Sequence, residues 1–335
     1  MHGAFETGLK VSEIHKFLFD GVPVRGVLVR LTDAWTEILR RRASGSGAYP
    51  APVQNLLGEM TAAVTLMQSN IKFNGALVLQ VFGDGPVKLA VAEAQSDFAL
   101  RATATVIGDV VPDASLSALV NLHHEGRCAI TLDPKDRLPG QQPYQGVVPL
   151  SLDGDTPMES LSQVLEHYMR QSEQLETTLV LAADDKVAAG LLIQRLPLAG
   201  AGNLAGSSSV DDDSIDSHED YRRIAILASS LQRGELLSLD ADTILRRLFW
   251  QEKIRRLRSN AEEARPYFAC NCSRERVEKM LVGLGQEEAQ SILTERGEIE
   301  VDCEFCGAQE RFDAVDVAQL FSAGVKVPTD GAARH

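Results

Sequence analysis

The chain has 335 residues, of which 44% are hydrophobic and 24% charged, and its formal net charge is −14. Its length exceeds the roughly 100–200 residues of a typical domain, so we expect more than one structural unit. Its longest apolar runs, such as 75–81 and 188–193, are far shorter than the roughly 20 residues that cross a bilayer, and its acidity argues against a general nucleic-acid binder. The first residues lack the basic and apolar regions of a secretory signal, which predicts a cytoplasmic protein.

The first 198 residues alternate between helical and strand-like patterns. Apolar residues at helical spacing predict helices at 32–41, 52–68 and 156–174. Aliphatic and β-branched runs predict strands at 26–31, 76–82, 87–92, 100–107, 127–132, 147–152, 179–182 and 188–196. The sequence GDGP at 83–86 predicts a hairpin turn in which glycine takes a positive φ. Together these patterns predict an α+β fold with a mainly antiparallel core.

The composition changes abruptly at Ala199. A glycine- and serine-rich stretch is followed by acidic residues up to Asp220, which predicts a flexible, solvated segment. From Tyr221 to about Leu257 the apolar spacing is helical, and we interpret this stretch as a helical middle region. The final module, from Pro266 to about Phe321, offers few residues for a core, so we expect a metal to stabilise it.

Four of the five cysteines lie in this final module, which is unlike the spread framework of a secreted disulfide-rich domain. Zinc favours four thiolates drawn from two closely spaced pairs. A Cys-x-Cys pair and a Cys-x-x-Cys pair, separated by 30 residues, match that pattern. The predicted ligands are Cys270, Cys272, Cys303 and Cys306.

The segment between the two pairs is suited to bring them together. Ser273 is a predicted helix cap, and that helix ends at Gly283 or Gly285. A second short helix at 287–293 precedes a strand at 299–301, which leads directly into the second cysteine pair.

Other interpretations of the four cysteines stay open at this point, namely two permanent disulfides or an iron–sulfur cluster. Four thiolates with no histidine nearby indicate a closed site and disfavour a hydrolytic zinc enzyme. A closed site can still respond to oxidants. Zinc keeps the sulfurs deprotonated, and their oxidation to disulfides would remove both the ligands and the energy that folds the module.

The remaining motifs predict no catalytic site. Cys128 is interpreted as a buried small hydrophobe, and residues 123–125 (HHE) as a polar loop. The sequence GDGP has neither the spacing of a dinucleotide site nor the lysine of a P-loop, so we expect no nucleotide cofactor and no enzyme. The basic segment 246–258 predicts a half-packed helix with a solvated basic face, or else an amphipathic surface that binds other proteins when uncovered. A nucleic-acid patch is a third interpretation.

At this point the sequence resembles the redox-regulated, thirty-three-kilodalton bacterial heat-shock chaperone family over nearly the whole chain. The resemblance depends on FACNCSRER (268–276), SILTERGEI (291–299) and CEFCG (303–307), of which the Cys-x-Cys pair is the most distinctive. The N-terminal part adds VRG (24–26), IKFNG (71–75), GDGP (83–86) and YQGVV (144–148).

The resemblance implies an ATP-independent holdase with three parts. These are an N-terminal α/β domain for substrate binding and dimerisation (1–198), a flexible acidic segment with a helical linker (199–265), and a C-terminal zinc-binding redox-switch domain (266–335). The reduced chain would bind one Zn²⁺ and be largely inactive. Oxidation would pair Cys270 with Cys272 and Cys303 with Cys306, release zinc, and destabilise the linker.

The implied partners are unfolding client proteins, a second copy of the chain when oxidised, and downstream ATP-dependent chaperones, with no nucleic acid or membrane. Two features depart from the family pattern: Glu310 stands where an aromatic residue is usual, and the stretch 196–219 is long. The alternative hypothesis is a constitutive zinc-stabilised module that binds protein or nucleic acid and never cycles its metal.

Overall fold

The computed structural model describes residues 11–45, 47–137, 140–197, 210–257 and 265–322, with only the backbone described for 210–217. Its strands are β1 (Glu13–Phe19), β2 (Val24–Leu31), β3 (Gly75–Phe82), β4 (Val87–Gln95), β5 (Ala99–Val106), β6 (Arg127–Pro134), β7 (Tyr144–Pro149), β8 (Thr177–Ala183), β9 (Ala188–Arg195), β10 (Ile254–Arg256), β11 (Tyr267–Phe268), β12 (Ile299–Asp302) and β13 (Gln309–Phe312). Its helices are α1 (Asp33–Gly45), α2 (Ala51–Asn70), α3 (Leu116–Val120), α4 (Leu161–Ser172), α5 (Val210–Ser229), α6 (Arg233–Ser238), α7 (Ala241–Leu248), α8 (Arg274–Leu284), α9 (Gln286–Arg296) and α10 (Ala314–Ser322).

Two large sheets form the body of the molecule. The first sheet has the order β10-β1-β2-β9-β8, and the second has the order β11-β5-β4-β3-β6-β7. Strand pairs in both sheets are antiparallel except for β11, which runs parallel to β5. The predicted α+β class with a mainly antiparallel core is therefore confirmed.

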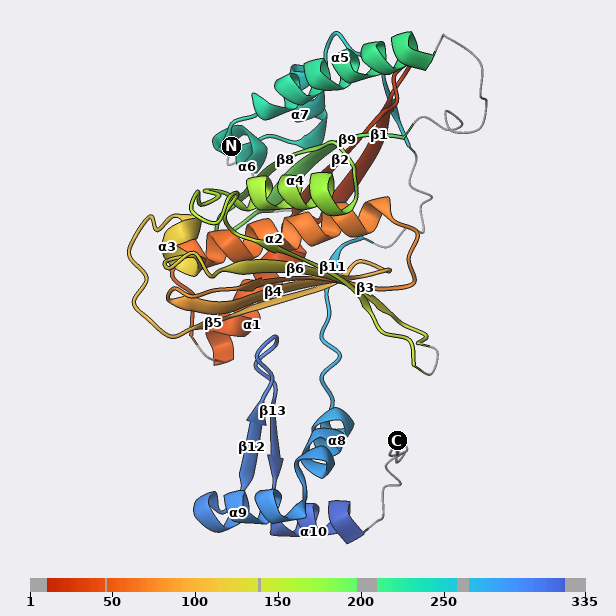
Figure 1. The fold of residues 1–335 in the computed structure, drawn as a ribbon. Coiled ribbons are helices and arrows are strands. Elements are labelled where there is room, and N and C mark those ends of the chain that lie inside the picture. Colours follow the sequence, from red (N-terminus) through yellow and green to blue (C-terminus); the bar gives the residue numbers. More distant parts are fainter. Residues whose placement is uncertain (1–10, 46, 138–139, 198–209, 258–264, 323–335) are drawn as a thin grey trace, which may run out of the picture.

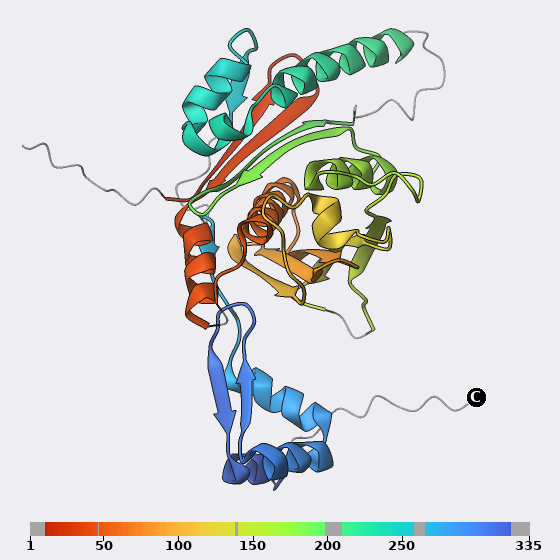
Figure 2. The same ribbon diagram turned by 90° about the vertical axis from the view of Figure 1, so that its left-hand side faces the viewer.

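Helices α2 and α4 lie between the two sheets (Figures 1 and 2). Helix α2 contacts strands of both sheets. Apolar residues lie almost all round it, and Val53, Leu57, Met60 and Val64 are completely buried. A helix that is buried on every side is expected where two sheets sandwich it. Gly58 is required at this crossing, because a Cβ there would lie 2.3 Å from the side chain of Ala183.

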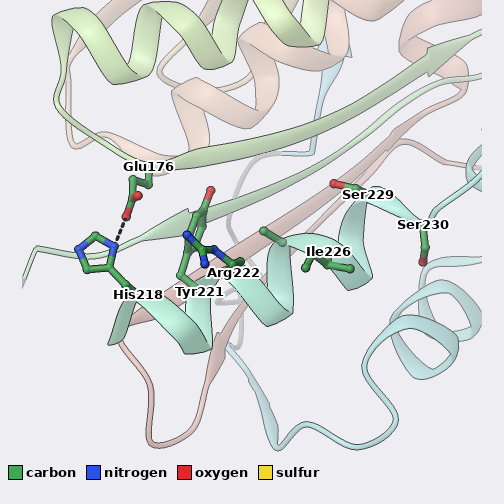
Figure 3. Close-up of a pocket in the computed structure, with 8 residues that line it drawn as sticks. Glu176, His218, Tyr221, Arg222, Ile226, Ser229 and Ser230 are labelled. Carbon is green, nitrogen blue, oxygen red and sulfur yellow. Dashed lines mark ion pairs between the residues drawn. The ribbon is translucent and has the colours of Figure 1, made fainter. Parts of the chain in front are cut away.

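Helices α5, α6 and α7 cover the opposite face of the first sheet (Figure 1) and form a second hydrophobic cluster with it. In Figure 3, the part of α5 from His218 onward lines a pocket of about 450 Å³ together with Glu176, which directly precedes β8. There His218 Nδ1 is 3.3 Å from a Glu176 carboxylate oxygen. The hydroxyls of Tyr221 and Thr178 are 3.0 Å apart, so the helix is held by polar as well as apolar contacts.

Two predictions about this region are wrong. Helix α5 begins at Val210, within the stretch predicted to be flexible up to Asp220. Acidic residues near a helix N-terminus stabilise the helix, because they interact favourably with its dipole. The basic segment 246–258 is not one helix, because α7 ends at Leu248 and β10 pairs with β1. Residues 199–209 of the predicted flexible segment lie outside the described residues.

Most other predicted elements are confirmed with shifted ends. Helix α4 begins at Leu161 rather than 156, because Ser160 accepts a hydrogen bond from Gln163 N and caps it. Strand β7 begins and ends about three residues before the predicted run, as its register with β6 places Tyr144 opposite Leu132. No helix of the described part of the chain is long and apolar enough to cross a membrane.

The turn at 83–86 joins β3 and β4 as predicted, but for a different reason. Neither glycine has a positive φ. Instead, a Cβ at Gly83 would lie 2.0 Å from the carbonyl oxygen of Val87, and one at Gly85 would lie 2.5 Å from that of Leu119. The Asp84 carboxylate accepts hydrogen bonds from backbone N–H groups of residues 122, 123 and 125, so the HHE segment is a polar loop as predicted.

Candidate metal centre

The last module is built on a very small core. Its two-stranded sheet, β12 and β13, packs with α8, α9 and α10 around five buried residues. These are Leu281, Ala289, Ile299, Phe312 and Val317. Such a core is too small to stabilise a domain by itself, so a further source of stability is expected.

Arg274 binds the parts of this module to one another. Its guanidinium lies 4.1 Å from the centre of the Phe312 ring and donates to the carbonyl oxygen of Arg311. It also forms ion pairs with Asp316 at 3.0 Å and Glu310 at 3.5 Å. Glu310, which departs from the family pattern, therefore has a partner inside the module.

The two cysteine pairs come from two loops. Cys270 and Cys272 lie between β11 and α8, where Ser273 accepts from Arg276 N and caps α8 as predicted. Cys303 and Cys306 lie in the turn between β12 and β13. That turn is closed by hydrogen bonds from Gly307 N to Cys303 O at 2.7 Å and from Cys303 N to Ala308 O at 2.8 Å.

The structure brings all four predicted sulfurs together, within 4.8 Å of one another. The Sγ atoms of Cys270 and Cys303 are 3.6 Å apart, and those of Cys272 and Cys306 are 3.2 Å apart. Sulfurs at the corners of a tetrahedron around zinc, with Zn–S bonds of about 2.3 Å, would lie about 3.8 Å apart. The arrangement therefore fits a tetrahedral metal site.

The electrostatics of the cluster also fit a cation. Burial raises the pKa of the Cys270 thiol, but the backbone N–H of Cys272 and the neighbouring thiols favour its thiolate more, so its pKa lies below the usual value. Burial and the neighbouring sulfurs raise the pKa of Cys272, and burial raises that of Cys303. Thiolates this close repel one another, and a divalent cation among them offsets that repulsion.

The cysteine turn contacts the second sheet. The Thr103 hydroxyl on β5 donates to the carbonyl oxygen of Glu304 at 2.9 Å. The Arg101 guanidinium lies 4.4 Å from the centre of the Phe305 ring and pairs with Glu93 on β4. Sequence reasoning missed these contacts, because nothing in the local pattern links residues about 200 positions apart.

Cys128 lies outside this cluster. It is completely buried in β6, in the main core between the sheets. Burial raises the pKa of its thiol to about 12, so it stays protonated and unreactive at neutral pH. The prediction that it is a buried small hydrophobe is confirmed.

The fold and the site together define a class of protein: a two-sheet α+β body that carries a separate module with a four-cysteine, metal-type centre. The family model described as Hsp33 protein matches residues 12–313. The chain belongs to this family.

Proteins named 33 kDa chaperonin are similar to this chain over nearly its whole length. The relative from Chromobacterium violaceum is 44% identical and covers 96% of this chain and 98% of its own. The relative from Nitrosococcus oceani is 41% identical, covering 94% and 96%. A solved structure of the 33 kDa chaperonin from Thermotoga maritima shares the fold, with a TM-score of 0.69 at 19% identity, covering 92% of this chain and 98% of that chain.

Proposed function

We propose that this chain is a redox-switched holdase, which binds unfolding proteins without ATP after its cysteine centre is oxidised. The observation that carries the proposal is the convergence of Cys270, Cys272, Cys303 and Cys306 to within 4.8 Å in a module with a five-residue core. A module that depends on its ligands for stability unfolds when the ligands are lost.

In the reduced state the four cysteines would hold one Zn²⁺, which keeps their sulfurs deprotonated when bound. A peroxide then oxidises the thiolates in pairs. Each pair gives up two electrons and forms one S–S bond, while the peroxide takes up two protons and becomes two waters or, for an alkyl peroxide, water and an alcohol. The pairs proposed are Cys270 with Cys272 and Cys303 with Cys306, which is the pairing that the resemblance to the family implies.

Loss of the ligand set would unfold residues 266–335 and destabilise the linker in 199–265. Surfaces of the N-terminal domain, residues 1–198, would then become available to clients and to a second copy of the chain. Clients would later pass to ATP-dependent chaperones. The same proposal includes two further points: the protein has no catalytic role, and it lies in the cytoplasm, where thiols are kept reduced.

The test is to measure zinc content and suppression of client aggregation on one sample, before and after peroxide treatment at raised temperature. Zinc release together with gain of activity, both reversed by a reductant, is the expected result. If zinc stays bound, or leaves without any gain in client binding, the constitutive zinc module takes over as the better hypothesis.

A pair of variants sharpens this test. Cys270→Ser removes one predicted ligand, so it should lower zinc content and expose the last module to protease even without oxidant. Cys128→Ala removes a thiol outside the cluster and should leave both properties unchanged. Equal zinc content in the two variants would contradict the assignment of the ligands.

A further inference from the structure

On its outer side, strand β5 is paired only with the short strand β11, which we call the cover. It has eight residues, but its outer neighbour β11 has two, and the pairing is limited to Tyr267 with Ala99 and Phe268 with Leu100. The cover is held by two backbone hydrogen bonds, from Tyr267 N to Phe98 O and from Ala269 N to Leu100 O, both 3.1 Å long, and by one from the Tyr267 hydroxyl to the Asp97 carboxylate at 2.9 Å. Edges of this kind are templates for pairing with another extended chain.

Beyond β11, the β5 edge is closed by Tyr49, a buried residue of the main core, and by the cysteine turn. Ala104 N donates to the Tyr49 hydroxyl at 2.8 Å, and that hydroxyl donates to Ala104 O at 3.1 Å. Along an antiparallel strand, the backbone N–H and C=O groups of alternate residues point to opposite sides. The backbone groups of Ala104, and of the other even-numbered residues of β5, therefore point away from β4. The Thr103 hydroxyl donates to Glu304 O in the cysteine turn itself.

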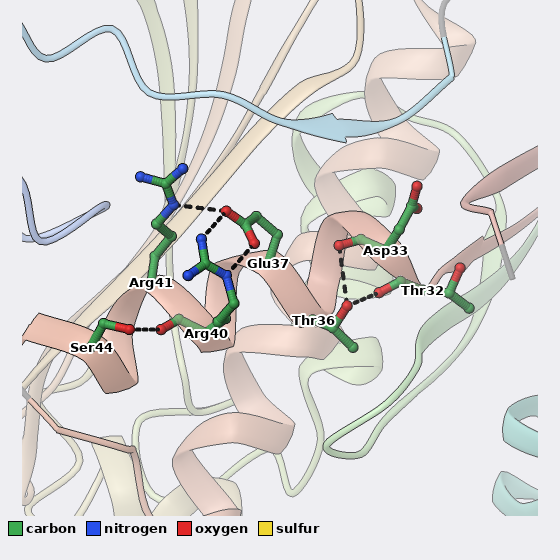
Figure 4. A network of polar contacts seen from close by, with 7 residues as sticks. All are labelled: Thr32, Asp33, Thr36, Glu37, Arg40, Arg41 and Ser44. Atoms are coloured by element: carbon green, nitrogen blue, oxygen red, sulfur yellow. Dashed lines mark hydrogen bonds and ion pairs between the residues drawn. The ribbon is translucent and has the colours of Figure 1, made fainter. Parts of the chain in front are cut away.

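Helix α1 forms the wall beside this edge. Figure 4 shows β11 running past α1, whose own polar side chains are bound within the helix, for example Glu37 to Arg40 and Arg41. The Arg41 guanidinium lies 5.5 Å from the centre of the Phe268 ring, which also packs against the main core. The wall and the edge thus bind an extended segment with an aromatic side chain.

The cover is linked directly to the cysteine centre. Ala269, which donates the second hydrogen bond to β5, immediately precedes Cys270. The opposite edge strand of the same sheet, β7, has no such connection, and its Val147 is already 51% exposed. Of the two ends of this sheet, the β5 side is therefore the one whose cover is joined directly to the cysteine centre.

We propose that the exposed edge of β5 is a client-binding site, where an extended apolar segment of an unfolding protein adds as a parallel strand in place of β11. This inference rests on the proposed function and names the surface that the switch uncovers. Segment 266–269 (PYFA) occupies the site in the resting protein as an internal substitute for the client. Strand addition suits a holdase, because main-chain hydrogen bonds recognise any extended chain.

The test uses the full chain with a photoreactive benzoyl-phenylalanine in place of Thr105 on β5, and a matched variant with the same group in place of Val147 on β7. Each is mixed with a denatured client, reduced or oxidised, and irradiated. Crosslinking is expected at position 105 only after oxidation. Replacement of Ile107, which directly follows β5 and is 66% exposed, provides a second position if the first variant does not fold.

Two competitor peptides separate strand addition from side-chain binding. A capped peptide with the sequence of residues 265–269 should abolish the crosslink. The same peptide N-methylated at the amides of Tyr267 and Ala269 cannot donate the two hydrogen bonds and should have no effect. Equal competition by both peptides would overturn the proposal.

The outcomes also separate this inference from the function on which it rests. If the oxidised variants release zinc and suppress aggregation but crosslink clients only elsewhere, the β5 site is wrong and the holdase stands. If the oxidised wild-type protein neither releases zinc nor suppresses aggregation, the proposed function fails and the β5 site fails with it.

Discussion

Replacement of Phe249 by alanine tests how the predicted linker, which contains α5, α6 and α7, is held on the first sheet. Phe249 directly follows α7, is 2% exposed, and lies with its ring centre 5.0 Å from that of Phe19 and 6.1 Å from that of Phe17. Truncation of a buried phenylalanine costs about 3–5 kcal/mol, a range that includes the loss of its ring contacts. Because these contacts join the predicted linker to the sheet, its undocking should become about a hundredfold to several thousandfold more favourable.

The measurement is amide hydrogen exchange on the reduced, zinc-loaded protein. Phe249→Ala should speed exchange in α5, α6 and α7 while the amides of α2 stay protected. Trp250→Ala is the matched control. Trp250 is the next residue in the chain, but its side chain is 73% exposed and contributes little to the contact with the sheet. Zinc content should be unchanged, because the linker cluster and the cysteine centre share no residues. Equal exchange in the two variants would refute the reasoning.

Two further predictions concern charged groups. Burial raises the pKa of Glu59 to about 7, although Arg233 at 3.5 Å opposes this, so the folded protein binds more protons than the unfolded chain and loses stability as the pH rises from about 4.5 to 7. Glu59→Gln should therefore unfold at higher urea concentration than wild type at pH 8 and at nearly the same concentration at pH 4.5, with at most about 3 kcal/mol between the two proteins; an equal difference at both pH values would contradict this. Arg101→Ala leaves the Glu93 carboxylate buried without its cation and removes the contact with Phe305, which should cost about 3 kcal/mol and speed zinc loss to a chelator. Adding Glu93→Gln should restore much of the stability but not the slow zinc loss, and unchanged zinc loss in Arg101→Ala would show that the contact does not hold the cysteine turn.

The sequence predicted the parts of the fold in which local pattern and burial agree. Most strands of both sheets and helix α2 were recognisable because their apolar residues recur at one period. Strand β1 was not predicted, because His15 and Lys16 interrupt its apolar residues. The cysteine site was equally accessible, since its four ligands lie within 37 residues and their types and spacing are restrictive.

The parts that escaped prediction are short or held by distant residues. Strands β10 and β11 have three and two residues, too few to show any period, and each exists only because an edge strand more than 150 positions away accepts it. The contact of Arg101 with Phe305 has the same origin. The predicted boundaries at residues 198 and 265 stay predictions, because both fall at or next to segments outside the described part of the chain.

If the proposed function holds, the sizes of two interfaces decide how oxidation of the cysteines affects the predicted linker. The cysteine module holds the body through the short strand β11, with its Tyr267 and Phe268 side chains, and through the contacts of one turn. The predicted linker instead buries a cluster of large side chains on the first sheet. Oxidation should therefore free the β5 edge at once but leave the linker docked until heating weakens its packing. Phe249→Ala removes several kcal/mol from that packing. We therefore expect that in this variant oxidation alone, at ordinary temperature, both frees the β5 edge and releases the predicted linker from the first sheet.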